Sequence, residues 1–246
     1  MQNFKKSNRF SHLLQARIIR LWKWFFTLFF RLLYHPFAWS YDLVANVVSV
    51  GAWKDWVKCS LPFIEGLRVL ELGFGPGHLQ QAMAEMGVMA YGIDESWPMV
   101  HRSQKLLTRP AGCHNGYAKS PRLVRGLAQA LPFPASSFHT VVTTFPAPYI
   151  LDPQTLAAVH RVLVPQGRLV MVLSAQITGQ RLIQRAAAGL FTLTGQTTQD
   201  ASPFIDLLHS AGFEVAVHLL DLPASRVLIL AGEKGSNACA GFAQDG

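Results

Sequence analysis

The sequence predicts an α/β fold in which parallel strands alternate with helices, and three observations indicate it. The first is a short apolar run, typical of a buried parallel strand, at Val69, Leu70 and Leu72. The second is a turn with glycine at every second position, at Gly73, Gly75 and Gly77. The third is the helical spacing of the apolar residues that follow, at Leu79, Met83 and Met86. A strand therefore passes into a helix through glycines, which permit positive φ and let a ligand approach the backbone.

Position 78 separates two kinds of ligand that use such a turn. The dinucleotide fingerprint Gly-x-Gly-x-x-Gly requires a glycine there, whereas this chain has His78. The pattern is instead Gly-x-Gly-x-Gly, with Glu71 two residues ahead of the first glycine. In these residues the sequence resembles motif I of the class I methyltransferases that use S-adenosyl-L-methionine.

The resemblance covers residues 66–232 and implies a Rossmann-like, seven-stranded, mostly parallel sheet with helices on both faces. We expect the methyltransferase domain at 61–232, followed by a disordered tail at 233–246. Before it, we expect residues 1–60 to form a basic, aromatic, amphipathic helical segment that is either a lid over the cofactor site or a membrane-interface anchor. After the first strand, we expect strands at 88–93, 123–124, 138–144, 168–173, 213–219 and 226–231. The resemblance also places a Pro-Gly-Gly-like turn at 164–167.

Asp94 is the last residue of the second predicted strand and follows the glycine turn by about 20 residues. In a βαβ unit, an acid at this spacing binds the ribose of the ligand. Family resemblance assigns that role to Asp94, and the adjacent Glu95 could substitute. The alternative is an acid at the N-terminus of the next helix, which does not explain the spacing.

The segment from Gly126 to Pro134 resembles the family's Gly-Asp-Ala-x-x-Leu-Pro-Phe stretch, which lines the adenine. Leu127 stands where the family commonly has Asp, so the resemblance leaves apolar and backbone contacts there, including Ala128. The fourth predicted strand runs into Phe145, at the position where methyl donor and acceptor meet in the family. This position looks apolar and aromatic and favours a hydrophobic or aromatic acceptor, although a rigid turn that closes the pocket is the alternative.

The positive charge is concentrated at the start of the chain. Residues 1–60 carry nine basic and two acidic residues, a net charge of +7 out of +8 for the whole chain. Three scattered cysteines and isolated histidines indicate neither a disulfide framework nor a metal site. The basic residues lie in an apolar context, which argues against nucleic acid as a partner.

Residues 13–33 predict an amphipathic helix with a narrow basic stripe and a wide aromatic face. Its longest uncharged stretch, 24–30, is far below the roughly 20 residues that span a bilayer. One interpretation is a peripheral helix in a membrane interface, and another is a helix packed on its own domain or on a second copy of the chain. An organelle transit peptide is a further alternative.

The sequence thus predicts an S-adenosyl-L-methionine-dependent methyltransferase with a small, hydrophobic, aromatic or lipid-like acceptor, in the cytoplasm or peripheral on the inner face of the membrane. The alternatives are a methyltransferase-like binding module without turnover and an NAD-dependent oxidoreductase. No catalytic base and no metal ligand is assigned, and the acceptor, the methylated atom and the oligomeric state stay open. The predicted cofactor-binding residues are Glu71, Gly73, Phe74, Gly75, Gly77, Asp94, Glu95, Leu127, Ala128 and Phe145.

Overall fold

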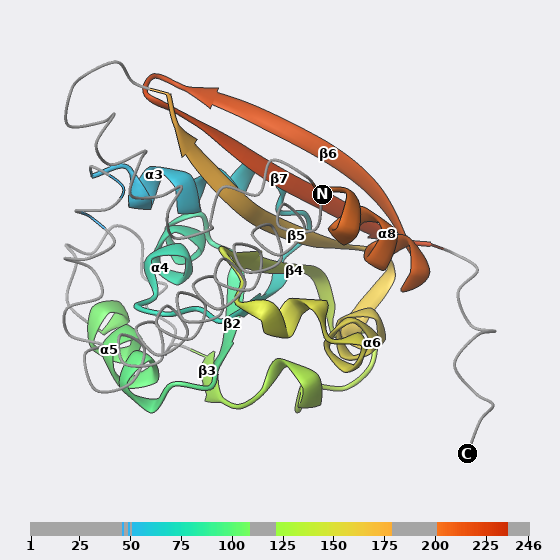
Figure 1. The fold of residues 1–246 in the computed structure, drawn as a ribbon. Coiled ribbons are helices and arrows are strands. Elements are labelled where there is room, and N and C mark those ends of the chain that lie inside the picture. Colours follow the sequence, from blue (N-terminus) through green and yellow to red (C-terminus); the bar gives the residue numbers. More distant parts are fainter. Residues whose placement is uncertain (1–45, 47–48, 50, 109–121, 179–200, 236–246) are drawn as a thin grey trace, which may run out of the picture.

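The computed structural model of the 246-residue chain describes residues 46, 49, 51–108, 122–178 and 201–235. These residues form a seven-stranded sheet with the strand order β3-β2-β1-β4-β5-β7-β6 (Figure 1). The strands are β1 (Arg68–Leu72), β2 (Met89–Asp94), β3 (Arg122–Arg125), β4 (Phe138–Thr144), β5 (Leu163–Ile177), β6 (Phe213–Leu222) and β7 (Ser225–Lys234). The predicted Rossmann-like fold is confirmed.

The first five strands run parallel, and the last two form an antiparallel hairpin at one edge of the sheet. β1 lies between β2 and β4, so the chain crosses from β3 at one edge to β4 on the other side of β1. β7 pairs antiparallel with both β5 and β6. The carboxyl ends of β1, β2, β3 and β4 therefore meet at one edge, where open α/β sheets bind their ligands.

Helices cover both faces of this sheet (Figure 1). One face carries α3 (Trp53–Lys58), α4 (His78–Glu85) and α5 (Trp97–Leu107), and the other carries α6 (Pro153–Val162) and α8 (Ser202–Ser210). Short 3-10 helices are η2 (Leu61–Phe63), η3 (Ala128–Ala130) and η4 (Pro148–Leu151). α6 starts as its sequence predicts, because Pro153 takes the first helical position and the Asp152 carboxylate accepts from the backbone N–H of Gln154 at 2.9 Å.

Each face of the sheet has its own hydrophobic core. On the α4 side, Val69, Val142, Val170 and Ile229 are fully buried against Trp56, Leu79 and Met83. On the α6 side, Leu70, Val141, Leu169 and Leu230 are buried against Leu156, Val159 and Phe213. In the centre of the sheet, successive apolar residues such as Val69 and Leu70 of β1 and Leu169 and Val170 of β5 are buried on opposite faces, which is typical of parallel strands covered on both sides.

The predicted turn at 164–167 is a bulge inside a longer strand. The β4–β5 register shifts there, from Phe138 opposite Leu163 to Thr140 opposite Arg168, and Gln166 has a φ of 61°. β5 consequently extends from Leu163 to Ile177 rather than over 168–173 alone. Residues 164–167 lie between the two registers and form a bulge in β5. The local sequence of such a bulge resembles that of a turn between two elements.

Several sequence predictions fall outside the described residues, among them the helix at 13–33 and most of the segment before Trp53. β7 continues to Lys234, whose Nζ donates to the carbonyls of His160 and Leu163 at 2.8 and 2.9 Å. These carbonyls belong to the end of α6, where a cation is electrostatically favoured. Within the described part of the chain, every helix is too short or too polar to cross a membrane.

Candidate functional site

The candidate site lies where the turn after β1 meets the ends of β2 and β4. β1 ends at Leu72, and the backbone N–H of the following Gly73 donates to Ile93 of β2 at 2.8 Å. On the other side, Leu72 pairs with Thr143, just before the end of β4. This is the point at which the strand order reverses, and it is therefore the expected position of a ligand crevice.

The three glycines of the turn all adopt positive φ, at 64° for Gly73, 50° for Gly75 and 89° for Gly77. Two of them are also required by their neighbours. A Cβ at Gly73 would lie 2.8 Å from the Tyr149 hydroxyl, and one at Gly77 would overlap the Ser103 hydroxyl. Gly77 is the N-cap of α4, so the close approach of α5 to the start of α4 depends on it.

Gly75 differs from the other two glycines. It is buried, yet among the described residues no neighbouring atom lies within 4 Å of the position that a Cβ would occupy. Its backbone N–H points to the Asp94 carboxylate, with a distance of 2.9 Å from N to Oδ2. The middle of the turn therefore combines a fixed backbone with free space beside it.

Asp94 holds the turn against the next loop. Its side chain is 8% exposed, and its second oxygen, Oδ1, accepts from the backbone N–H of Ser96 at 2.8 Å. The carbonyl of Asp94 accepts from the backbone N–H of Gly126, which follows β3. The structure thus brings the Asp94 carboxylate and the Gly75 backbone together at the end of β2.

Glu71 lies beneath the turn. Its carboxylate is 2% exposed, and Oε2 accepts from Gln80 Nε2 at 2.8 Å, while the same amide nitrogen donates to the carbonyl of Tyr91 at 3.1 Å. Burial raises the pKa of Glu71 to about 8; the hydrogen bond from Gln80 opposes this shift, and the negative charge of Asp94 adds to it. Glu71 is thus placed to link β1 to α4, and its predicted contact with a cofactor stays a prediction.

The neighbours of these acids differ in exposure. The Phe74 side chain is buried, because it packs where Gly92 of β2 leaves room. Glu95 is exposed, and its carbonyl accepts from Arg125 Nε at 3.1 Å. Phe74 can therefore offer only backbone to a ligand at the turn, and Glu95 lies at the rim beside Asp94.

Leu127 and Ala128 follow Gly126 at the end of β3, on the same edge as Asp94. Leu127 is 48% exposed, a large exposed fraction for an apolar side chain. Ala128 is half-buried and begins η3. The structure therefore places an apolar surface beside Asp94, at the position where the resemblance would have an Asp.

Phe145 follows β4 in a strained backbone conformation, with a φ of 48°. Its N–H donates to the carbonyl of Val172 at 2.8 Å, and its ring stacks on Trp53 of α3 with centroids 4.6 Å apart. Trp56 lies 6.2 Å from the same ring and is fixed by a hydrogen bond from its Nε1 to the Ser225 hydroxyl. The half-buried rings of Phe145 and Trp53 thus lie at the carboxyl end of β4, next to the fully buried Trp56.

Sequence reasoning missed Trp53 and Gln80 as parts of this site, whereas Tyr149 follows the fourth predicted strand and was expected beside the acceptor. The Tyr149 hydroxyl donates to the carbonyl of Leu72 at 3.3 Å and lies 3.2 Å from the Thr143 hydroxyl, beneath Gly73. The apolar run of α4 gives no reason to single out Gln80, and Trp53 is 92 positions away from Phe145. A short sequence motif does not report such contacts.

The family model described as "Methyltransferase domain" matches residues 70–171, which include the glycine turn, Asp94 and Phe145. Residues 70–171 are a class I S-adenosylmethionine-dependent methyltransferase domain. This methyltransferase is 29% identical over 225 residues to a ubiquinone/menaquinone biosynthesis C-methyltransferase of Teredinibacter turnerae, covering 86% of this chain and 82% of that protein. The match decides against the NAD-dependent oxidoreductase considered above.

Two further comparisons agree with this assignment. A demethylmenaquinone methyltransferase of Lactiplantibacillus plantarum is 30% identical over 151 residues, 58% of this chain and 62% of that protein. The fold of this methyltransferase is similar to a methyltransferase from Thermotoga maritima described as a possible histamine N-methyltransferase, with a TM-score of 0.55 at 16% identity over 80% of this chain and 98% of that one. Other quinone methyltransferases are matched over 54–56% of their length.

The described residues of this methyltransferase fit S-adenosyl-L-methionine, the cofactor of its family. The space beside Gly75 is the cradle that a Cβ would fill, and Asp94 offers acceptors suited to ribose hydroxyls. The N-terminus of α4 offers backbone N–H groups suited to a carboxylate. Within the described ranges, no group of three histidine, cysteine or acidic side chains is arranged to hold a metal ion.

The glycine turn yields a prediction for two alanine variants. Gly75→Ala meets open space and should lower the free energy of unfolding by about 1 kcal/mol, the cost of left-handed backbone, yet raise the Kd of S-adenosylhomocysteine at least about tenfold by filling the cradle. Gly77→Ala should lose more stability, because its Cβ overlaps Ser103. Urea unfolding and calorimetry measure the two quantities. Unchanged binding by a folded Gly75→Ala would contradict this placement of the ligand.

Glu71 yields a prediction about pH. Because its pKa is raised from 4.5 to about 8, the folded protein binds a proton that the unfolded chain has released, and this part of the stability is lost as pH rises through about 8. The stability of Glu71→Gln relative to wild type should therefore rise from pH 4.5 to about pH 8 and then level off, as measured by urea unfolding across that range. The exposed Glu85→Gln on α4 is the control. If the difference in unfolding free energy between Glu71→Gln and wild type did not change with pH, the raised pKa of Glu71 would be contradicted.

Proposed function

We propose that this methyltransferase transfers a methyl group to a ring carbon of a quinone-like, hydrophobic aromatic acceptor. The observation that carries the proposal is the stacked pair of Trp53 and Phe145, whose centroids are 4.6 Å apart beside the glycine turn. Flat aromatic rings bind such a surface by stacking and by burial of apolar area. The names of the two quinone methyltransferases that this chain resembles support the same acceptor class.

The chain's own residues would position the two reactants. S-adenosyl-L-methionine, when bound, supplies a methyl group on a positively charged sulfur that is already activated for transfer. Asp94 would accept hydrogen bonds from the ribose, and the turn at Gly75 would hold the donor against the backbone. Trp53 and Phe145 would hold the acceptor ring in line and exclude water, so positioning and desolvation supply most of the acceleration.

The transfer needs no catalytic metal and little acid–base chemistry from the protein. S-adenosyl-L-methionine would supply the methyl group and keep the electron pair of the broken sulfur–methyl bond, while the acceptor carbon would gain the methyl group and release its own proton to water. A carbon nucleophile requires an electron-rich ring, so the reduced, dihydroxy form of the acceptor is the reacting form. Tyr149 donates its hydroxyl proton to the Leu72 carbonyl, and this bond makes it a support of the turn rather than a base.

We also propose that residues 13–33 bring the enzyme to a membrane surface, where a lipid-like acceptor would be found. Support comes from the sequence, in which a wide aromatic face adjoins a basic stripe. Deleting residues 1–33 should abolish sedimentation with anionic vesicles, measured at low salt. A full-length protein that stays in the supernatant would contradict this proposal and leave the chemistry of methyl transfer unaffected.

The acceptor is tested by incubating the protein with S-adenosyl-L-methionine and a reduced demethylated naphthoquinone, followed by mass spectrometry of the product. A gain of one carbon-bound methyl group is the expected result. Trp53→Leu should raise the KM for the acceptor about tenfold through lost stacking area, while the Kd of S-adenosylhomocysteine is unchanged. Trp53→Phe is the matched variant and should retain most of the affinity. Equal KM values for Trp53→Leu and wild type would show that the acceptor does not stack on Trp53.

A further inference from the structure

A groove of about 590 Å³ lies far from the glycine turn, on the sheet face that carries α3. It is lined by Phe63, Arg168, Glu214, Val215, Ala216, His218, Ala231 and Glu233. Arg168 stands near the start of the parallel run of β5, whereas the candidate site lies at the carboxyl ends of the strands. This acidic groove is therefore separate from the methyl-transfer site.

The floor of the acidic groove is apolar, because small residues face each other there. Ala216 of β6 pairs directly with Ala231 of β7, and short side chains leave the sheet face hollow. Phe63 forms a wall, with its ring 4.7 Å from that of His218. A helix with an apolar face can bury several side chains on such a surface.

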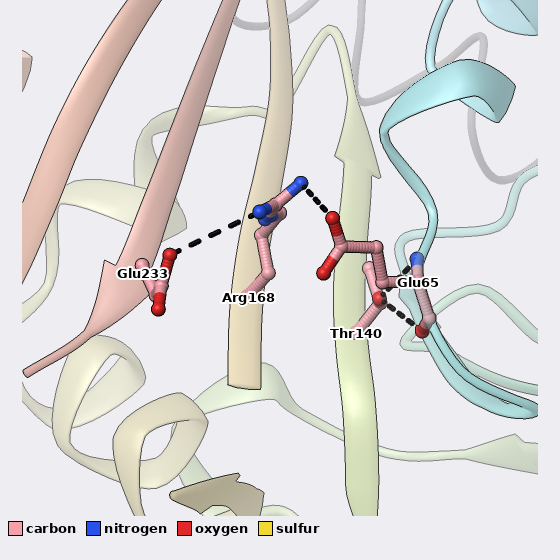
Figure 2. Close-up of polar contacts among 4 residues, drawn as sticks. All are labelled: Glu65, Thr140, Arg168 and Glu233. Atoms are coloured by element: carbon pink, nitrogen blue, oxygen red, sulfur yellow. Dashed lines mark hydrogen bonds and ion pairs between the residues drawn. The ribbon is translucent and has the colours of Figure 1, made fainter. Parts of the chain in front are cut away.

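The rim of the acidic groove carries more negative than positive charge. Glu214 and Glu233 are direct cross-strand partners on the same face of the β6–β7 hairpin, an arrangement that is unfavourable for like charges. Arg168 is opposite Glu233 in the sheet, yet it lies closer to Glu65, at 2.7 Å against 3.9 Å (Figure 2). One guanidinium therefore lies between two carboxylates, and Glu214 adds a third acid to the rim.

The position of Glu65 on this rim is fixed by the backbone. Its N–H donates to the Thr140 hydroxyl at 3.0 Å, and that hydroxyl donates to the carbonyl of Glu65 at 2.7 Å (Figure 2). The Glu65 and Glu233 side chains are 60% and 50% exposed, so both remain accessible to an external cation. An apolar floor with an acidic rim is complementary to an amphipathic basic segment.

We propose that the acidic groove binds residues 13–33 of this chain when no membrane is present. The apolar face of that segment would cover the floor between Phe63 and Ala216, and its basic stripe would meet the rim. The basic residues of the stripe are Arg17, Arg20, Lys23 and Arg31. The charge distribution supports this occupant, because residues 1–60 carry +7 of the chain's net +8.

The helix that follows the N-terminal segment in sequence, α3, lies on the same face of the sheet as the acidic groove. α3 begins at Trp53, and Trp56 is bonded to Ser225 at the tip of the β6–β7 hairpin, on the same face as the groove. From Ser225 to Glu233 the strand rises about 26 Å, and a 21-residue helix is about 31 Å long, so the segment spans the distance. Residues 34–52 are available as a connection.

Hydrogen–deuterium exchange of the full-length protein, in buffer without lipid, tests the proposal. Peptides from residues 13–33 should be protected in the wild type. Glu214→Gln with Glu233→Gln should raise their uptake rate about tenfold, the change expected when two partly exposed ion pairs are lost. Glu85→Gln with Asp206→Asn removes the same charge from two exposed helical sites and should leave the protection unchanged.

Three results would overturn the proposal. Unprotected peptides in the wild type would show that the segment does not dock, and equal uptake in the groove variant and the control would place the segment elsewhere. Protection that rises with protein concentration would assign the segment to a second copy of the chain. Exchange in β6 and β7 reports whether the groove variant is folded, and methyl transfer is not measured, so a negative result leaves the proposed reaction untouched.

Discussion

The Asp94 carboxylate accepts from two backbone N–H groups, and the arrangement of the site depends on this pair of hydrogen bonds. One comes from Gly75 at 2.9 Å and the other from Ser96 at 2.8 Å, so the glycine turn and the start of α5 are fixed to the end of β2. Backbone donors to a buried carboxylate are among the stronger hydrogen bonds in proteins. The Gly126 N–H adds the end of β3 through the Asp94 carbonyl, so three loops converge on one residue.

This convergence suits a reaction in which the protein supplies position rather than chemistry. The methyl donor is activated before it binds, so the enzyme must hold it in line with an acceptor and exclude water. In the proposed site, Asp94 and the turn provide the polar side, and Phe145 and Trp53 provide the apolar side. The buried Glu71 supports the turn from below through Gln80, without facing the space beside Gly75.

The local sequence pattern was sufficient to predict most of the fold and part of the candidate site. The turn and Asp94 could be predicted because β1, α4 and β2 follow one another, and their spacing along the chain fixes their spacing in space. The stack of Trp53 on Phe145 and the pairing of Arg168 with Glu65 could not, because these contacts join residues about a hundred positions apart and no periodicity encodes them. From sequence alone, residues 164–167 predict a turn. The bulge they form is defined by a register shift against the neighbouring β4, which the local sequence does not contain.

The most direct test of the account is calorimetric titration of wild type and Asp94→Asn with S-adenosylhomocysteine. Asparagine has one acceptor oxygen, so it cannot serve both backbone donors and the ribose, and the Kd should rise from micromolar by about 10- to 100-fold while the fold persists. Asp206→Asn, at an exposed helical site, should bind as the wild type does. Equal affinity in wild type and Asp94→Asn would contradict the claim that Asp94 organises the donor site.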